Sequence, residues 1–175
     1  MKSKITYRIW QYRQSFNHSP DDEDWEKIYQ ILSPMEVDLF RRLPIPDQNH
    51  SLRVLGSLEE QAEKDPGLLK AALLHDVGKI LHPLKRWERV FAVLVSRFFP
   101  HWAAIWGEGN PKGFLRPLVV IQQHARWGAD LAAAAGSSDQ VVWLIGNHEQ
   151  EPSPGKQNQP DTDLLKKLQA VDNRN

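Results

Sequence analysis

The chain contains no cysteine among its 175 residues, which excludes disulfides and zinc sites built on thiolates. Any metal must therefore be held by histidine and carboxylate side chains. Basic and acidic residues both number 22, so the net charge gives no reason to expect specific nucleic-acid binding. No apolar run approaches the roughly 20 residues that span a bilayer, and the N-terminal sequence MKSKITYRIWQYRQSF lacks the apolar core of a signal peptide. We therefore expect a cytoplasmic protein.

Signals for β-strands are also scarce, whereas signals for helix starts are frequent. Ser33-Pro34-Met35-Glu36 is a capping box, and Asp65-Pro66 opens an apolar helix that we expect to end with Gly78 at its C′ position. Further helical patterns run over residues 118–123, 127–135 and 139–148, while Asp47 and Asp161 are expected to cap helices that begin just after them. The fold class is all-α, a bundle of about seven to nine helices.

Two parts of the chain differ in character. Residues 1–18 form a basic segment whose apolar residues fall at helical spacing, so we expect an N-terminal amphipathic arm followed by one domain over residues 19–175. The segment Trp87–Trp106 is rich in aromatic residues and flanked by arginines and lysines. Its composition is equally consistent with a core helix followed by a packed loop and with an exposed apolar surface. The exposed alternatives are a lid over a hydrophobic substrate, a homodimer face, and a peripheral membrane contact on anionic lipid.

Four of the seven histidines lie on or at the end of expected helices: His50, His75, His124 and His148. Any one of them taken alone is more often a structural residue than a ligand. Together with Asp76 and Asp172, however, they could converge, because facing helices of a bundle supply inward-pointing histidine and carboxylate ligands to one or two metals. The remaining histidines, His18, His82 and His101, lie beside prolines in expected loops.

The local sequences around these residues occur in a specific order. They are HSLRVL at His50, AALLHDVGK at His75, HARWGADLA at His124 and LQAVDN at Asp172. In this order they resemble the HD-domain superfamily of metal-dependent phosphohydrolases, whose pattern is His, then an adjacent His-Asp pair, then Asp. The resemblance extends from about Asp47 to Asp172, and it implies an HD-like helical bundle.

The resemblance also implies roles for individual residues. His50, His75, Asp76 and Asp172 would be ligands of a first divalent metal, and in relatives with two metals His124 and His148 would bind the second while Asp76 bridges both. Such relatives often have a His-His pair where this chain has Asn147-His148, which puts the second site in question. The Gly-Tyr-Pro signature of cyclic dinucleotide phosphodiesterases is missing after His148, where the sequence continues HEQEPSPG.

The ligand types limit the metal without identifying it. Imidazole and carboxylate together suit Fe, Mn, Zn, Ni or Mg. His75 and Asp76 would project about 100° apart on a regular helix, so sharing an ion requires an irregular turn, which Gly78 would permit. Lys79 is a candidate both for binding a substrate phosphate and for a solvated lysine at a helix end. Arg53, on the same helical face as His50, could bind phosphate or pair with a neighbouring acid.

The expected function is metal-dependent hydrolysis of a phosphate ester or anhydride by metal-activated water, with Asp76 and Lys79 as the catalytic residues. The expected substrate is a nucleotide or another small phosphorylated metabolite. Two alternatives stay open. One is a di-iron oxygenase on the same scaffold, and the other is a degenerate HD module that binds a nucleotide or a membrane without turnover.

Overall fold

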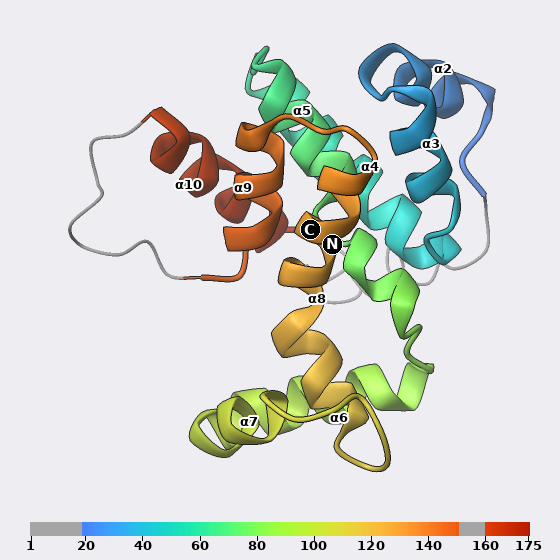
Figure 1. Ribbon diagram of the computed structural model, residues 1–175. Helices are drawn as coiled ribbons and strands as arrows, with labels where there is room; N and C mark the ends of the chain where they lie inside the picture. The colour runs from blue at the N-terminus through green and yellow to red at the C-terminus, as the bar shows by residue number, and fades with distance from the viewer. Residues whose placement is uncertain (1–18, 151–159) are drawn as a thin grey trace, which may run out of the picture.

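The computed structural model describes residues 19–150 and 160–175. In these residues the chain forms nine α-helices, one 3-10 helix and no strand, which confirms the all-α fold class (Figure 1). The basic arm expected at residues 1–18 lies outside the described residues. The helices are α2 (Asp22–Ile31), α3 (Pro34–Arg41), α4 (Ile45–Glu60), α5 (Pro66–Leu74), η1 (Val77–Leu81), α6 (Arg86–Phe98), α7 (Pro100–Gly107), α8 (Arg116–Ala134), α9 (Asp139–Asn147) and α10 (Pro160–Asp172).

Two of the predicted helix caps are present in the structure, and two are not. The Ser33–Glu36 capping box is present, and the Asp65 side chain accepts a hydrogen bond from the Leu68 amide at the start of α5. Asp47 was expected to cap α4, but this is wrong, because α4 begins at Ile45 and Asp47 already lies in its first turn. Asp161 likewise lies within α10, which begins at Pro160. The two patterns expected at 118–123 and 127–135 belong to the single helix α8.

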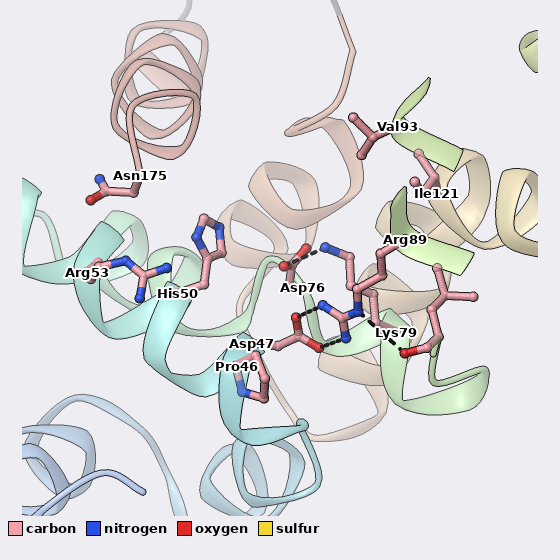
Figure 2. A pocket seen from close by; sticks show the side chains of 11 residues that line it. Pro46, Asp47, His50, Arg53, Asp76, Lys79, Arg89, Val93, Ile121 and Asn175 are labelled. Atoms are coloured by element: carbon pink, nitrogen blue, oxygen red, sulfur yellow. Dashed lines mark hydrogen bonds and ion pairs between the residues drawn. The ribbon is translucent and has the colours of Figure 1, made fainter. Parts of the chain in front are cut away.

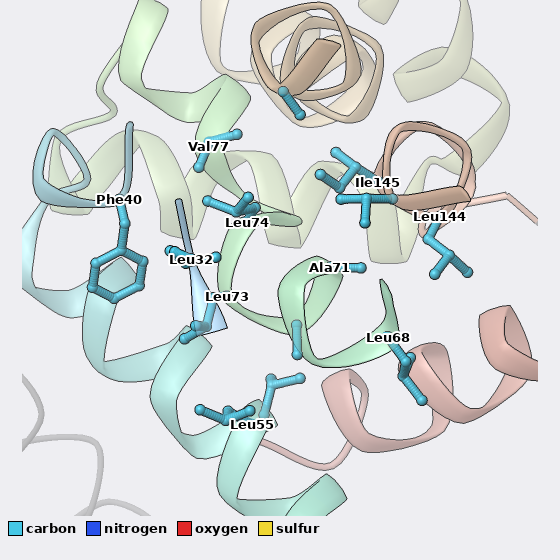
Figure 3. Close-up of a cluster of buried hydrophobic side chains, with 14 of the residues drawn as sticks. Leu32, Phe40, Leu55, Leu68, Ala71, Leu73, Leu74, Val77, Leu144 and Ile145 are labelled. Atoms are coloured by element: carbon cyan, nitrogen blue, oxygen red, sulfur yellow. The ribbon is translucent and has the colours of Figure 1, made fainter. Parts of the chain in front are cut away.

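Helix α5 is the centre of the bundle. Its sequence PGLLKAALL is apolar on nearly all sides, as expected for a helix that is surrounded by others, and it contacts α2, α3, α4, α9 and α10. Leu68, Ala71, Leu73 and Leu74 are fully buried and meet Leu144 of α9 and side chains of the other helices in one core (Figure 3). The last turn of α5 therefore delivers the residues that follow it to the middle of the molecule.

Gly78 has a different role from the one expected. It lies inside η1, not at the C′ position of α5, and its φ is not positive. A Cβ atom at Gly78 would collide with the backbone carbonyl oxygen of His124 and lie 2.7 Å from the amide nitrogen of Gly128. The amide nitrogen of Gly78 in turn lies 3.2 Å from where a Cβ of Gly128 would be. The two glycines thus let η1 and α8 pack backbone against backbone.

Helices α6 and α7 lie apart from the main bundle. They pack on each other and on the N-terminal half of α8, which extends from the bundle toward them (Figure 1). Their small core consists of Ala92, Ala103 and Leu118 with partly buried neighbours. None of the helices in the described parts of the chain is long and apolar enough to cross a membrane.

Glu36 connects three parts of the bundle although it is a charged residue. Its side chain is only 1% exposed, and its carboxylate accepts hydrogen bonds from the Lys70 ammonium (2.7 Å), the Ser137 hydroxyl (2.7 Å) and the Ser33 amide (2.7 Å). These partners lie on α5, after α8 and before α3. A buried carboxylate with this many donors is stabilising only as long as all of them are kept.

Replacing Glu36 with alanine is expected to lower the free energy of unfolding by about 3 kcal/mol, since three donors lose their partner. Thermal or urea unfolding of the two proteins measures the difference. Lys167→Ala is the matched control, because its pair with Glu63 is exposed and should cost less than about 1 kcal/mol. Equal losses in both variants would contradict the role given to Glu36.

The same carboxylate predicts a pH dependence. Burial acts to raise the pKa of Glu36, but the hydrogen bonds from Lys70 and Ser33 outweigh it, so the pKa lies below its ordinary value. A carboxyl whose pKa is lowered by folding stabilises the protein above its unfolded pKa of about 4.5 and loses this effect as the pH falls through its folded pKa. We therefore expect the stability difference between the wild type and Glu36→Ala to be constant near neutral pH and to shrink below about pH 4.5.

Candidate metal centre

Six residues predicted from the sequence come together at the centre of the bundle, although they come from different helices. His50 lies in α4 and His124 in α8, while the other four lie at helix ends: His75 and Asp76 between α5 and η1, His148 after α9, and Asp172 at the end of α10. His75, Asp76, His124 and His148 are buried, and His50 and Asp172 are partly exposed. The site is thus closed on one side and open on the other.

The adjacent pair His75-Asp76 adopts the irregular turn that its role would need. His75 closes α5 with helical dihedrals, and Asp76 then departs to φ −95° and ψ 0°, before the tighter helix η1 begins. This bridge region of backbone conformation is sparsely populated and common among active-site residues. On a regular helix two adjacent side chains would point about 100° apart. The irregular turn removes this constraint, so both side chains face the same centre.

The side chains form two groups with metal-ligand geometry. His50, His75 and Asp76 make one, and Asp76, His124 and His148 make the other, with the ligand atoms of each group within 4.8 Å of one another. Asp76 is the member shared by both. Its Oδ2 lies 3.7 Å from Nε2 of His75, whereas its Oδ1 lies 3.3 Å from Nε2 of His124 and 4.0 Å from Nε2 of His148. The carboxylate therefore presents a different oxygen to each group.

Backbone carbonyls fix the protonation of three imidazoles. The Nδ1 atoms of His75, His124 and His148 lie 3.0, 2.8 and 2.7 Å from the carbonyl oxygens three residues earlier in the chain. A carbonyl oxygen only accepts, so each Nδ1 must carry the hydrogen and donate it. Each ring then turns its Nε2 toward the centre, which is the orientation that outer hydrogen bonds impose on metal-binding histidines.

This arrangement of buried acceptor atoms fits a bound cation. Nε2 of His75 is buried and has no hydrogen-bond partner within the described part of the chain. Nε2 of His124 lies 3.3 Å from Nε2 of His148 and equally close to Asp76, so lone pairs and a carboxylate oxygen face one another. Buried acceptors without donors are unfavourable unless a proton or a cation lies between them. The residues present therefore suit one or two divalent ions.

The electrostatics keep these groups in the form that binds metal. Burial acts to raise the pKa of Asp76, but the neighbouring Lys79 ammonium, together with His75 and His124, outweighs it and holds that pKa well below its ordinary value. Burial lowers the pKa of His148 to about 3, and the neighbouring His75 and His124 act in the same direction. At neutral pH the centre thus offers a carboxylate and a neutral imidazole, both of which are ready to act as ligands.

Asp172, expected as a ligand of the first metal, lies beside the first group. Its Oδ1 is 2.7 Å from Nε2 of His50 and 3.6 Å from Nε2 of His75. Burial acts to raise the pKa of Asp172, yet the hydrogen bond from His50 lowers it below its ordinary value. In this arrangement the carboxylate orients His50 and remains within reach of the centre.

The open side of the centre is a cleft of about 390 Å³ with basic residues at its wall (Figure 2). Lys79 does not extend into solvent, because its ammonium lies 2.6 Å from Oδ2 of Asp76. Burial acts to lower the pKa of Lys79, but the charges of Asp76 and Asp47 raise it, so the side chain stays cationic. Arg53 is the second basic residue. Burial lowers its pKa.

Several residues around the site were not found from the sequence. Asp47, expected as a helix cap, makes a bidentate ion pair with Arg89 of α6, with distances of 2.6 and 2.7 Å, and both residues line the cleft. Glu149 places a carboxylate oxygen 3.7 Å from Nε2 of His124 and 3.8 Å from Nε2 of His148. Its position directly after His148 is the one signal that could have indicated it.

The end of α9 is held from a distant helix. Gln169 of α10 donates through its side-chain amide to the carbonyl oxygens of His148 (3.0 Å) and Gln150 (2.7 Å). The Asn147 side chain makes a local contact instead, because its amide donates a hydrogen bond to the carbonyl oxygen of Trp143 in the preceding turn at 2.7 Å. The Asn147 side chain is therefore no candidate ligand, and the Glu149 carboxylate is the additional acidic group near the second ligand group.

Two further histidines of the described residues, His82 and His101, lie away from the centre. The His82 ring packs against Trp127, with ring centroids 5.1 Å apart, and the His101 ring packs against Trp102 at 5.9 Å. His18 lies outside the described residues.

Comparison with known proteins gives one match. The family described as the HD domain matches residues 48–174, a range that contains all six residues of the candidate centre. No curated protein and no solved structure gives a significant match. The match covers most of the chain, and the fold and the His, His-Asp, Asp order agree with it. The chain belongs to the HD domain family.

Proposed function

We propose that this HD domain protein hydrolyses a phosphate ester or anhydride with the help of divalent metal ions held by the six residues of the centre. The observation that carries the proposal is the position of Asp76, which belongs to both ligand groups and turns one carboxylate oxygen toward each. A carboxylate shared by two ligand groups would suit a site for two divalent ions, which in two-metal sites lie about 3.5–4 Å apart. When bound, such ions lower the pKa of a water molecule and neutralise charge on a phosphoryl group.

The protein's own basic residues would then bind the substrate phosphate. Figure 2 shows Arg53 and Lys79 on opposite sides of Asp76 at the wall of the cleft. The Lys79 ammonium, now paired with Asp76, is within reach of a phosphoryl oxygen placed at the centre. Arg53 offers a guanidinium that is partly buried and suited to bidentate contact with phosphate. Asp76 and Lys79 are accordingly the proposed catalytic residues.

The shape of the cleft supports a small phosphorylated metabolite or a nucleotide as the substrate. Its volume of about 390 Å³ is within the usual range for small-molecule sites. Val93 and Ile121 line the cleft away from the charged wall, where an apolar or aromatic part of the substrate would find contacts. The polar and apolar walls thus match a molecule with a phosphate at one end.

Elemental analysis of the chain purified without chelators, followed by a panel of phosphomonoesters and nucleotides with added Mn²⁺ or Fe²⁺, tests the proposal. We expect one to two ions per chain and hydrolysis that EDTA abolishes. Tightly bound iron with oxygen-dependent oxidation and no hydrolysis would instead support the oxygenase alternative. Substoichiometric metal with no turnover of any compound would support the non-catalytic alternative.

Arg53→Ala is expected to raise KM for the phosphorylated substrate about 10- to 100-fold, the value of one hydrogen bond to a charged group. Metal content should not change, because Arg53 belongs to neither ligand group. Steady-state kinetics and elemental analysis measure the two quantities. Arg42→Ala is the matched control, since Arg42 is exposed after α3, outside the cleft. An unchanged KM in the Arg53 variant would rule out its role in binding phosphate.

A further inference from the structure

The α6–α7 arm, which we define as residues 85–116, carries most of the exposed apolar surface of the described chain. Of thirteen large hydrophobic side chains that are exposed, all but Tyr29, Met35 and Leu81 lie in the arm. Figure 1 shows α6 and α7 at one end of the molecule, at the foot of α8 and away from the rest of the bundle. Exposed apolar residues that gather in this way mark an interaction surface.

The exposed residues of the arm lie on defined helix faces. On α6, Trp87, Val90, Leu94 and Phe98 follow a spacing of three, four and four, and each is at least 50% exposed. Ala92 is fully buried on the opposite side of the same helix. On α7, Trp102, Ile105 and Trp106 share a face, and Phe99 and Phe114 are exposed as well, with the Phe114 ring against Phe91 of α6. Helix α6 is thus amphipathic with an apolar face directed outward, and α7 is apolar on most sides with several large side chains exposed.

The α6–α7 arm carries a net positive charge. Residues 85–116 contain six Lys or Arg and two Asp or Glu, so the arm is basic while the whole chain has a net charge of zero. Within the arm, Arg116 is paired with the buried Glu88, and Arg89 is paired with Asp47 of α4. The remaining charged residues are exposed: Lys85, Arg86, Arg97 and Lys112, with the single acid Glu108. The rest of the molecule therefore has an equal excess of acidic residues.

We propose that the α6–α7 arm rests on the surface of an anionic phospholipid bilayer. Tryptophan and phenylalanine beside lysine and arginine match the boundary between headgroups and acyl chains, where aromatic rings insert shallowly and basic side chains meet lipid phosphates. Outside the arm and residues 1–18 the chain has an excess of acidic residues, so the same surface would repel it and favour an orientation with the arm toward the lipid.

Two other occupants fit the charges less well. A second copy of the chain, joined arm to arm, would bring two basic surfaces together. Residues 1–18 contain Lys2, Lys4, Arg8 and Arg13 and no acidic residue, so they would also be repelled by the arm. The same basic segment would be attracted by anionic lipid. An anionic bilayer would attract both the arm and the N-terminal segment.

The arm is also connected to the metal centre. Val93 of α6 lines the cleft, and the Arg89–Asp47 ion pair attaches α6 to α4, which carries His50. An arm lying on a bilayer would therefore place the opening of the cleft near the lipid surface.

Co-sedimentation of the full chain with vesicles tests the proposal. Phosphatidylcholine vesicles with about 30% phosphatidylserine should bind at least about fivefold more protein than pure phosphatidylcholine vesicles, and high salt should reduce the difference. The double variant Leu94→Glu with Phe98→Glu should fall to background. Arg97→Glu with Lys112→Glu should lose the preference for phosphatidylserine. Met35→Glu, an exposed residue of α3, is the matched control and should bind like the wild type.

Circular dichroism and metal content should be unchanged in these variants, because all five positions are exposed. Equal or absent binding to both vesicle types would overturn the proposal, as would normal binding by the Leu94/Phe98 variant. It would equally be overturned if Arg8→Glu with Arg13→Glu alone abolished binding while the arm variants bound normally. A wild-type dimer in analytical ultracentrifugation that Phe98→Glu dissociates, without any vesicle binding, would assign the arm to self-association instead.

Discussion

Asp76→Asn is expected to remove both metal ions and to reduce kcat/KM by about 10³-fold or more, which corresponds to about 4 kcal/mol of lost transition-state stabilisation. The reason is geometric. Asp76 is the only member common to the two ligand groups found in the described chain, so losing its charge weakens both. Elemental analysis of the purified variant and steady-state kinetics with added metal measure the two effects.

Variants on either side of Asp76 separate the two groups. If two ions bind, His148→Ala should lose one ion and keep the other, since His148 belongs only to the group with His124. His50→Ala should lose the ion of the group with His75 and keep the ion of the group with His124. If only one ion binds, at the group of His50 and His75, then His148→Ala should leave the metal content unchanged. The pair of variants therefore decides between one and two ions, independently of activity.

Asp130→Asn is the control for the loss of a carboxylate, because Asp130 is exposed on α8 and belongs to neither ligand group. It should keep full metal content and activity. Asp76 is buried and paired with Lys79, so the melting temperature of Asp76→Asn must be measured as well. A folded Asp76→Asn protein with normal metal content would refute the shared-ligand interpretation.

Gly78→Ala is expected to lower the free energy of unfolding by about 3 kcal/mol, at the upper end of the cost of overpacking. The added methyl group would meet the backbone of α8 at His124 and Gly128, and backbone atoms have no rotamer through which to move aside. The shift of η1 away from α8 would also separate Asp76 from His124, now 3.3 Å apart. Chemical unfolding and the metal content of the folded protein measure these two consequences.

Gly56→Ala is the matched control for this substitution. Gly56 lies within α4, and a Cβ atom there would meet nothing within 4 Å. Alanine should therefore stabilise the helix by about 0.5–1 kcal/mol through its better helix propensity. If both alanine variants were equally stable, close packing between η1 and α8 would not be the reason for glycine at position 78.

The features that the sequence predicted correctly depend on near neighbours. The Ser33 capping box and the Asp65 cap require only residues three positions away, and both are present. The order of histidines and aspartates was informative for another reason, because it matches a family whose fold brings those positions together. Neither inference required knowing how the helices pack.

The features that the sequence missed depend on distant partners. Asp47 has the residue type and the position of a helix cap, but its carboxylate forms an ion pair with Arg89, which lies 42 residues later in the chain. Gly78 has the sequence position of a glycine that ends a helix, but glycine is needed there because the backbone of α8 packs against it. Gln169 holds the end of α9 across a separation of about 20 residues. Such contacts are created by tertiary packing and leave no periodic signal in the chain.

The helix ends that meet at the centre have a consequence for its electric field. His75 closes α5, His148 closes α9 and Asp172 is the last residue of α10, so three helices direct their C-terminal ends toward one point. Each C-terminal end carries about half a negative charge from its aligned peptide dipoles. The fold thus surrounds the six side chains with a negative potential that attracts cations before any ligand bond forms. Strong binding of a free anion there would therefore require the metal to be bound first.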